Sequence, residues 1–208
     1  MKTHTPASHL ASLLLALSVL LSSCTGLHAP ATENINLYVL DARASIKAAP
    51  VKRDLVIAVA MPRARPGYDT PRIAYVQQPH ELNYYAVNRW ANTPAHMLAP
   101  LLAQALEQSG GFRAVVQIPG PVPSDIRLDT ELVRLQQDFG THPSRVQITL
   151  RAQLIDVRNN RVLATRLFDE SENAPSENAY GGVVAANLAL QRILDKVSDF
   201  CLRESVDP

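Results

Sequence analysis

The segment that decides the fold is VQITLRAQLIDVRNNRVLATRLFD, residues 146–169. Apolar and polar residues alternate along its first half, from Val146 to Leu154, which is the pattern of a strand with one buried face and one wet face. The Asn159-Asn160 pair near its middle tolerates the positive φ that a tight turn needs. The segment therefore predicts two antiparallel strands, over residues 146–157 and 162–169, joined by a tight turn.

Strand patterns also precede this hairpin. Residues 55–59 form a short β-branched run that is typical of a central strand. Residues 72–76 and 81–86 flank a four-residue connection and predict a second hairpin. Residues 126–139 alternate like a strand, although Leu132, Leu135 and Phe139 also fit a helix. Further strands are expected at residues 35–40 and 112–118, and an irregular loop at residues 63–71.

Two helices are predicted. The first begins at Thr93-Pro94, where the Thr93 hydroxyl can accept from a free amide of the first turn, and Gly110-Gly111 ends it. Pro100 should kink this helix or move its start toward Ala99. The second helix runs over residues 178–202 and carries an apolar stripe that should pack on the sheet. The predicted fold class is α/β of the α+β kind, a mostly antiparallel sheet with two main helices packed on it.

The first residues of the chain are predicted to direct secretion and lipidation. An apolar run of about 12 residues, Leu10–Leu21, is too short to span a bilayer of ~30 Å and leads into Ser22-Ser23-Cys24. This is the pattern of a bacterial lipobox, in which the cysteine is acylated and becomes the first residue after cleavage. Thr25 follows where Asp would indicate retention at the inner membrane, so we expect Cys24 to anchor the chain in the outer membrane. An ordinary signal peptide with an incidental Cys24 is the alternative.

The predicted organisation is a signal peptide at residues 1–23, an acylated cysteine and flexible tether at 24–34, one domain at 35–202 and a tail at 203–208. Lys2 is the only Lys, Arg, Asp or Glu in the signal peptide, so the remaining chain carries 19 basic and 19 acidic side chains. A net charge of zero gives no reason to expect nucleic acid as a partner. Contact with the membrane is expected through the acyl anchor alone.

The residue types that carry catalysis or bind metals do not form a recognisable motif. His80, His96 and His142 lie singly, without the spacing of metal ligands. Asp125, Asp129 and Glu131 alternate on a predicted strand, which is typical of a surface ladder of charges. The mature chain has no nucleophile elbow, penicillin-binding motif or phosphate-binding loop. We therefore expect a protein that is not an enzyme and has no cofactor, no metal site and no catalytic residue.

Cys201 lies on the apolar side of the last predicted helix. If Cys24 is lipidated, Cys201 has no cysteine left to pair with, despite the oxidising periplasm. We expect it to be a buried and unreactive thiol.

Three segments together resemble a known family. They are Tyr38 in the first strand, the run from Pro71-Arg72-Ile73-Ala74-Tyr75 to Leu82–Ala91, and the hairpin at Leu154-Ile155-Asp156 with its Ala-rich closing helix. They resemble the ABC-type transport auxiliary lipoproteins, the PqiC-like family, over about residues 34–202. The resemblance implies a fold similar to the amino-terminal domain of TolB. It also implies an outer-membrane lipoprotein that accompanies an ABC transporter ATPase, its permease and an MCE-domain protein in moving phospholipid or other lipid between two membranes.

The aromatic segment before the first helix is predicted to bind the partner. Tyr84, Tyr85, Arg89 and Trp90 lie within seven residues of a chain that has only eleven aromatic residues. Tyrosine and tryptophan bury much area at interfaces and keep a polar end, and arginine can add a bidentate or cation–π contact. The alternative is that Trp90 and Tyr85 fill the core where the hairpin meets the helix. The segment can both bind a partner and fill the core, because alternate residues of a strand face opposite sides of the sheet.

Two other functions stay open. The chain could be a lipid carrier, which requires an apolar cavity of roughly 300 Å³ or more. It could instead activate a periplasmic cell-wall enzyme, since fold alone does not decide function. The sequence also leaves open whether copies of the chain form a homo-oligomer.

Overall fold

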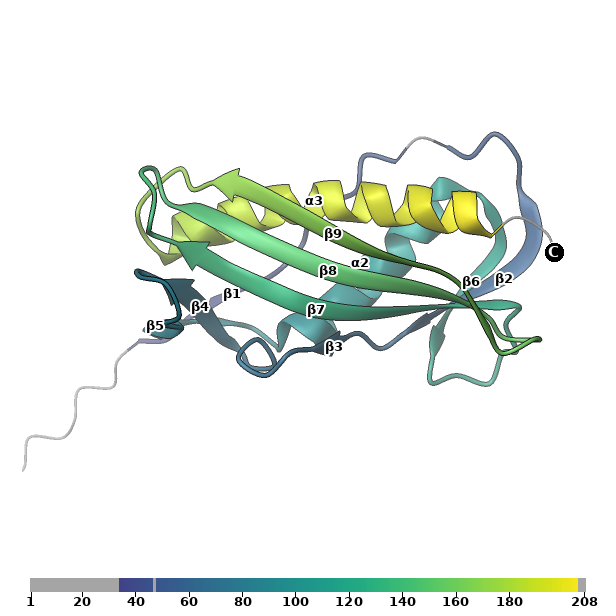
Figure 1. The fold of residues 1–208 in the computed structure, drawn as a ribbon, viewed down its shortest axis with the longest axis horizontal. Coiled ribbons are helices and arrows are strands. Elements are labelled where there is room, and N and C mark those ends of the chain that lie inside the picture. Colours follow the sequence, from purple (N-terminus) through teal and green to yellow (C-terminus); the bar gives the residue numbers. More distant parts are fainter. Residues whose placement is uncertain (1–33, 47, 206–208) are drawn as a thin grey trace, which may run out of the picture. The chain divides into compact units, whose positions relative to one another are not determined.

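Two helices pack on one face of a mixed sheet (Figure 1). The computed structural model describes residues 34–46 and 48–205, so the predicted signal peptide and the acylation of Cys24 lie outside the described residues. The helices are α2 (Pro94–Ser109) and α3 (Ala179–Glu204). The strands are β1 (Asn36–Tyr38), β2 (Arg53–Ala60), β3 (Arg63–Ala64), β4 (Arg72–Val76), β5 (Asn83–Trp90), β6 (Phe112–Ile118), β7 (Ile126–Asp138), β8 (Arg145–Asp156) and β9 (Arg161–Asn173).

The predicted hairpin is confirmed as β8 and β9. Strand β8 is antiparallel to β7 on one side and to β9 on the other over almost its whole length. Asn160 takes the positive φ of 49° that the turn requires. Residues 126–139 are a strand, as predicted. Leu132 and Leu135 both face the core although they are three residues apart, because the register with β8 shifts between Leu132 and Arg134. This bulge is what imitates helical spacing in the sequence.

The second edge of β7 is shared by three groups of strands. β2 and then β6 continue the sheet at one end, β3 pairs in the middle, and β4, β5 and β1 continue it at the other end. Five of the strand pairs among the described residues are parallel and three are antiparallel. The sheet is therefore mixed, with the longest ladders antiparallel, and the fold is α+β as predicted.

Both helices begin and end close to the predicted residues. α2 begins at Pro94, with Pro100 inside it, and Gly110 ends it in the left-handed conformation at φ 62°. The predicted side-chain cap is wrong, because the Thr93 hydroxyl lies 2.7 Å from Nδ1 of His96 and takes no amide of the first turn. α3 is capped by Asn178, whose side chain accepts from the Gly181 amide at 2.9 Å.

The core lies between the sheet and the two helices, where α3 packs on β8 and β9 and α2 on β2 and β6. The largest fully buried side chains are Phe200, Ile57, Leu98, Leu102, Leu106, Leu128, Leu132, Ile148, Leu150, Leu154, Leu190 and Ile193. Cys201 belongs to this core, and its burial raises the pKa of the thiol, as expected for an unreactive cysteine. Among the described helices, neither is long and apolar enough to cross a membrane.

Candidate functional site

The predicted partner-binding residues lie on β5, whose pairing with β4 is irregular. Arg72 pairs with Arg89 and Ala74 with Tyr84, so β5 advances five residues while β4 advances two. Extra residues in one strand bulge it and re-aim the side chains that follow. As a result, one residue before the bulge and one after it can face the same side of the sheet even when their residue numbers differ by an odd number.

Trp90 and Tyr85 both use this bulge to face the helices. Trp90 is 3% exposed and packs in the core beside Ile73, Gly182 and Ala186. The Tyr85 ring is half-buried, 4.8 Å from that of Tyr75. These positions favour the interpretation that both rings fill the core where the hairpin meets the helix.

The Tyr85 hydroxyl is held by a buried polar network. It donates to Oε1 of Gln137 at 2.9 Å, and Nε2 of Gln137 donates to the Ser144 hydroxyl at 2.9 Å. The Ser144 amide in turn donates to Glu177, in the segment before α3. Burial raises the pKa of Tyr85 to about 12, so the hydroxyl keeps its proton. Tyr85 therefore ties β5 to β7 and to the start of α3.

Gly182 lets α3 approach this network closely. A Cβ at this position would lie 2.3 Å from Oε1 of Gln137. Gly182 thus serves the close packing of α3 on the sheet, whereas a Cβ at Gly181 would meet Ser176 in the segment before the helix.

Tyr84 and Arg89 lie on the opposite face of the sheet from Trp90. The Tyr84 hydroxyl donates to the Gly67 carbonyl oxygen at 2.9 Å, and the Arg72 guanidinium lies 4.0 Å from the centre of the Tyr84 ring. Gly67 has a φ of 96°, a conformation that favours glycine, so the chain can turn tightly there. The predicted irregular loop is therefore fixed to the sheet through Tyr84.

A row of three side chains crosses this face. Leu37 on β1 pairs with Arg89 on β5, and Arg89 pairs with Arg72 on β4. Directly paired residues project from the same face of a sheet, so the three side chains are neighbours. We call Leu37, Arg72, Tyr84 and Arg89 the arginine patch.

The arginine patch is electrostatically unbalanced. No carboxylate of the described residues lies within 4.0 Å of the Arg72 or Arg89 guanidinium. Nε of Arg89 is buried and has no hydrogen-bond partner. Like charges opposite each other on neighbouring strands destabilise a sheet, and so does a buried donor without an acceptor. The patch is thus suited to receive negative charge.

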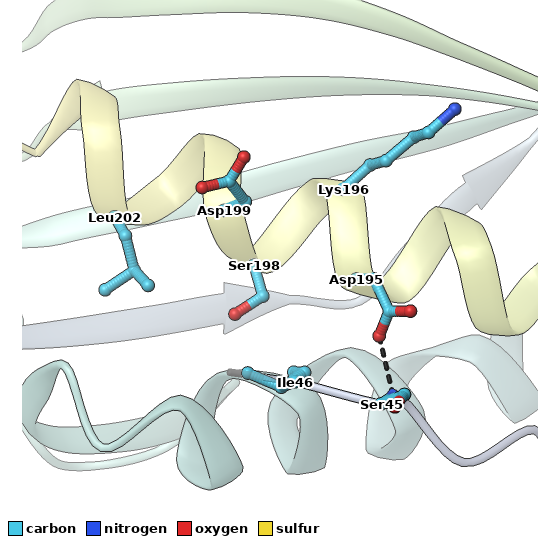
Figure 2. Close-up of a pocket in the computed structure, with 7 residues that line it drawn as sticks. All are labelled: Ser45, Ile46, Asp195, Lys196, Ser198, Asp199 and Leu202. Carbon is cyan, nitrogen blue, oxygen red and sulfur yellow. Dashed lines mark hydrogen bonds between the residues drawn. The ribbon is translucent and has the colours of Figure 1, made fainter. Parts of the chain in front are cut away.

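The larger hollows on the surface have mostly polar and charged residues in their linings, with apolar residues among them. One of about 430 Å³ lies between α3 and the segment before β2, and its walls are mainly Ser45, Asp195, Lys196, Ser198 and Asp199, with Ile46 and Leu202 (Figure 2). Figure 2 shows the Asp195 carboxylate turned toward Ser45, whose amide donates to it at 2.7 Å. A second hollow of about 330 Å³ lies beside the β4–β5 turn and is lined by residues such as Gln136, Asp138 and Arg145. The apolar space beside Trp90 measures only about 10 Å³.

The acidic residues that were predicted to form a surface ladder divide into two groups. Asp129 and Glu131 are half-exposed and pair with arginines, as in a ladder. Asp125 is 9% exposed and accepts from the Val56 amide at 2.8 Å, so its place in the ladder was wrongly predicted. Among residues 34–46 and 48–205, no group of His, Cys, Asp or Glu side chains could hold a metal ion.

Comparison with known proteins gives the family. The profile that matches residues 38–198 is that of the ABC-type transport auxiliary lipoprotein component. The chain belongs to this family. The resemblance inferred from the sequence is therefore confirmed, and with it a lipoprotein role as an auxiliary component of transport. The family is not a known enzyme family. A search of the curated proteins finds no match.

Solved structures agree with this assignment. A Xanthomonas campestris protein of family DUF330 is 27% identical, with a TM-score of 0.75, and the match covers 81% of this chain and 96% of that one. An uncharacterised protein is 16% identical with a TM-score of 0.62, over 84% of this chain and 100% of that one. A hypothetical protein from Chlamydia trachomatis is 13% identical with a TM-score of 0.51, and the match covers 72% of this chain and 96% of that one. The last two support the fold alone.

Proposed function

We propose that this chain is an outer-membrane lipoprotein, anchored by Cys24 on the periplasmic side, that docks an MCE-domain protein and its ABC transporter during lipid transport between the two membranes. The family supports the auxiliary lipoprotein role. The MCE partner, the outer membrane and the docking mode are our proposal. An acyl anchor confines the chain to one layer of the periplasm, so a modest affinity for the partner is sufficient.

The observation that carries the docking proposal is the arginine patch. Tyr84 and Arg89 remain part-exposed on the face of the sheet that the helices leave open. Arginine and tyrosine are enriched among the residues that contribute most to binding at interfaces. Trp90 and Tyr85, which pack inward, are proposed to support this surface through the fold, without touching the partner.

The hollows favour docking over a lipid carrier. An acyl chain requires an apolar cavity of a few hundred Å³. Each hollow of that size among the described residues has several charged or polar side chains in its lining, including one of about 330 Å³ bordered by Met61, Arg127 and Asp129, and the mainly apolar hollow is too small for an acyl chain.

The test is recovery of the partner from the bacterial envelope. The acylated chain, carrying an affinity tag, would be cross-linked in cells and purified, and the recovered proteins would be quantified by mass spectrometry. We expect an MCE-domain protein together with an ABC ATPase and permease. Loss of one interface anchor costs more than about 1 kcal/mol, so Tyr84→Ala and Arg89→Ala should each lower recovery by about fivefold or more.

Tyr180→Ala is the matched control. Tyr180 is an exposed tyrosine at the start of α3, on the helix side of the sheet, so its removal should leave recovery unchanged. Purification of the wild-type chain without any MCE or ABC component would reject the proposed function. Normal recovery with both Tyr84→Ala and Arg89→Ala would reject this surface as the docking site.

A further inference from the structure

We infer that the arginine patch binds a carboxylate from an acidic segment of the partner protein, held between Arg72 and Arg89. The inference rests on the proposed docking function and adds the chemistry of the partner. The proposed ligand is a single acidic side chain with apolar residues beside it. It binds to the row of side chains that β1, β5 and β4 present on the open face of the sheet.

The first argument is the placement of the two guanidinium groups. Arg72 and Arg89 are directly opposite each other on antiparallel strands, so their side chains leave the sheet side by side. The Tyr84 ring lies against the Arg72 guanidinium at 4.0 Å and limits where that side chain can move. Two planar guanidinium groups offer several N–H donors in a fork that matches the two oxygens of a carboxylate.

The second argument is that the guanidinium groups of Arg72 and Arg89 have no carboxylate acceptor among the described residues. Two part-buried arginines elsewhere on the sheet reach carboxylates: Arg127 pairs with Asp129 at 2.7 Å, and Arg145, whose Nε is also buried without a partner, pairs with Asp138 at 3.5 Å. Arg72 and Arg89 have no such partner among the described residues, and Nε of Arg89 is buried without an acceptor. An unsatisfied buried donor in a native structure calls for an explanation, and a ligand that supplies the acceptor is one.

The third argument concerns the source of the negative charge. Attraction to anionic lipid is typical of clusters of about four to eight basic residues, and this patch has two. Its other members are Leu37, 64% exposed, and the Tyr84 ring. A pair of arginines with an aliphatic and an aromatic neighbour has the composition of a protein interface, in which charge is sparse and apolar contact surrounds it. The observations therefore favour an acidic protein segment over a lipid surface.

The experiment uses the acylated full chain in nanodiscs of zwitterionic lipid. Two fluorescent peptides serve as probes, one of alternating Glu and Leu and one with Gln in place of each Glu. Binding is followed by fluorescence anisotropy at low and high salt. We expect the Glu peptide to bind at least tenfold more tightly than the Gln peptide, since hydrogen bonds to charged groups are the stronger ones. Because the attraction is between charges at a surface, its affinity should fall as salt rises.

Variants separate this site from general charge effects. The double variant Arg72→Gln, Arg89→Gln should lose at least tenfold in affinity for the Glu peptide. Arg161→Gln removes an exposed arginine at the far end of the sheet, at the start of β9, and should bind as the wild type does. The double variant also relieves the repulsion between the two arginines, so its thermal midpoint should match or exceed that of the wild type. This would exclude unfolding as the cause of lost binding.

The inference is overturned if the wild-type chain binds the two peptides equally, or if the double variant binds the Glu peptide as tightly as the wild type. It is also overturned if nanodiscs containing phosphatidylglycerol abolish peptide binding, which would assign the patch to lipid phosphate. These outcomes are independent of the proposed function. Recovery of the MCE-domain protein tests that function separately, and either result can fail while the other stands.

Discussion

Replacing Asp125 by alanine should destabilise the protein by about 1–5 kcal/mol. Its carboxylate accepts from the buried Val56 amide at 2.8 Å, and it also pairs with Arg158 and, at 3.7 Å, with Arg113. Loss of the acceptor leaves the Val56 amide unsatisfied, which costs about 1–3 kcal/mol. The side chains of Arg158 and Arg113 are 71% and 52% exposed, so each ion pair adds only about 0–1 kcal/mol.

Urea unfolding of a fragment of residues 25–208 measures this free energy. Arg158→Ala is the control for the ion pair and should cost under about 1 kcal/mol. Asp125→Asn keeps an acceptor for the Val56 amide, so the stability that it loses should lie between the losses for Arg158→Ala and Asp125→Ala. The reasoning is refuted if Asp125→Ala unfolds at the wild-type urea concentration, or if Arg158→Ala costs as much as Asp125→Ala.

Acid provides a second test of the same carboxylate. The hydrogen bond from the Val56 amide, with help from Arg158, holds the pKa of Asp125 below its ordinary value. A carboxylate whose pKa is lowered by folding stabilises the native state above the pKa of the unfolded chain. That stability is lost as the pH falls through the lower pKa of the folded state. The difference in stability between the wild type and Asp125→Asn should therefore be constant from pH 7 to 5 and shrink below about pH 4.

Trp90→Ala should cost about 3–5 kcal/mol in urea unfolding, because the ring is buried, and a loss under about 1 kcal/mol would contradict its place in the core. Cys24→Ser should abolish labelling by a radioactive fatty acid, because Cys24 is the predicted acceptor, and labelling that persists would contradict the lipoprotein prediction at this residue. Native mass spectrometry of residues 25–208 should show no phospholipid, since charged and polar side chains line each of the larger hollows. One bound phospholipid per chain would favour the carrier instead.

The sequence was sufficient to predict a strand where apolar and polar residues alternate within one continuous segment. β8 was predicted within one residue of its observed bounds, because alternate residues of one hairpin report directly which face is buried. β9 was predicted to end at residue 169 and runs to Asn173, since its last residues are polar and do not show this alternation. The parallel pairing of β2 with both β6 and β7 could not be predicted in this way. It joins segments far apart in the chain, and alternation says nothing about which strand lies next to which.

The candidate site was only partly predictable, and the reason is the register. The aromatic segment was identified from its composition, but the bulge decides which of its residues face the helices. Arg72 was not predicted to take part, and Leu37 was assigned only to a half-buried strand. The three members of the row lie on three separate strands, with 17 residues from Arg72 to Arg89 and 52 from Leu37 to Arg89, and no spacing rule connects them. Only the pairing of the strands brings them together.

The bulge in β5 explains how one short segment can serve both the core and the surface. In a regular strand, Tyr85 and Trp90 would face opposite sides, and one of the two rings would be exposed. The extra residues let both rings pack inward, while the neighbours Tyr84 and Arg89 are turned together toward the open face beside Arg72. The core contacts of Tyr85 and Trp90 then hold two like-charged arginines side by side against their repulsion. A surface fixed in this way is ordered before a partner arrives, so less binding energy is spent on ordering it.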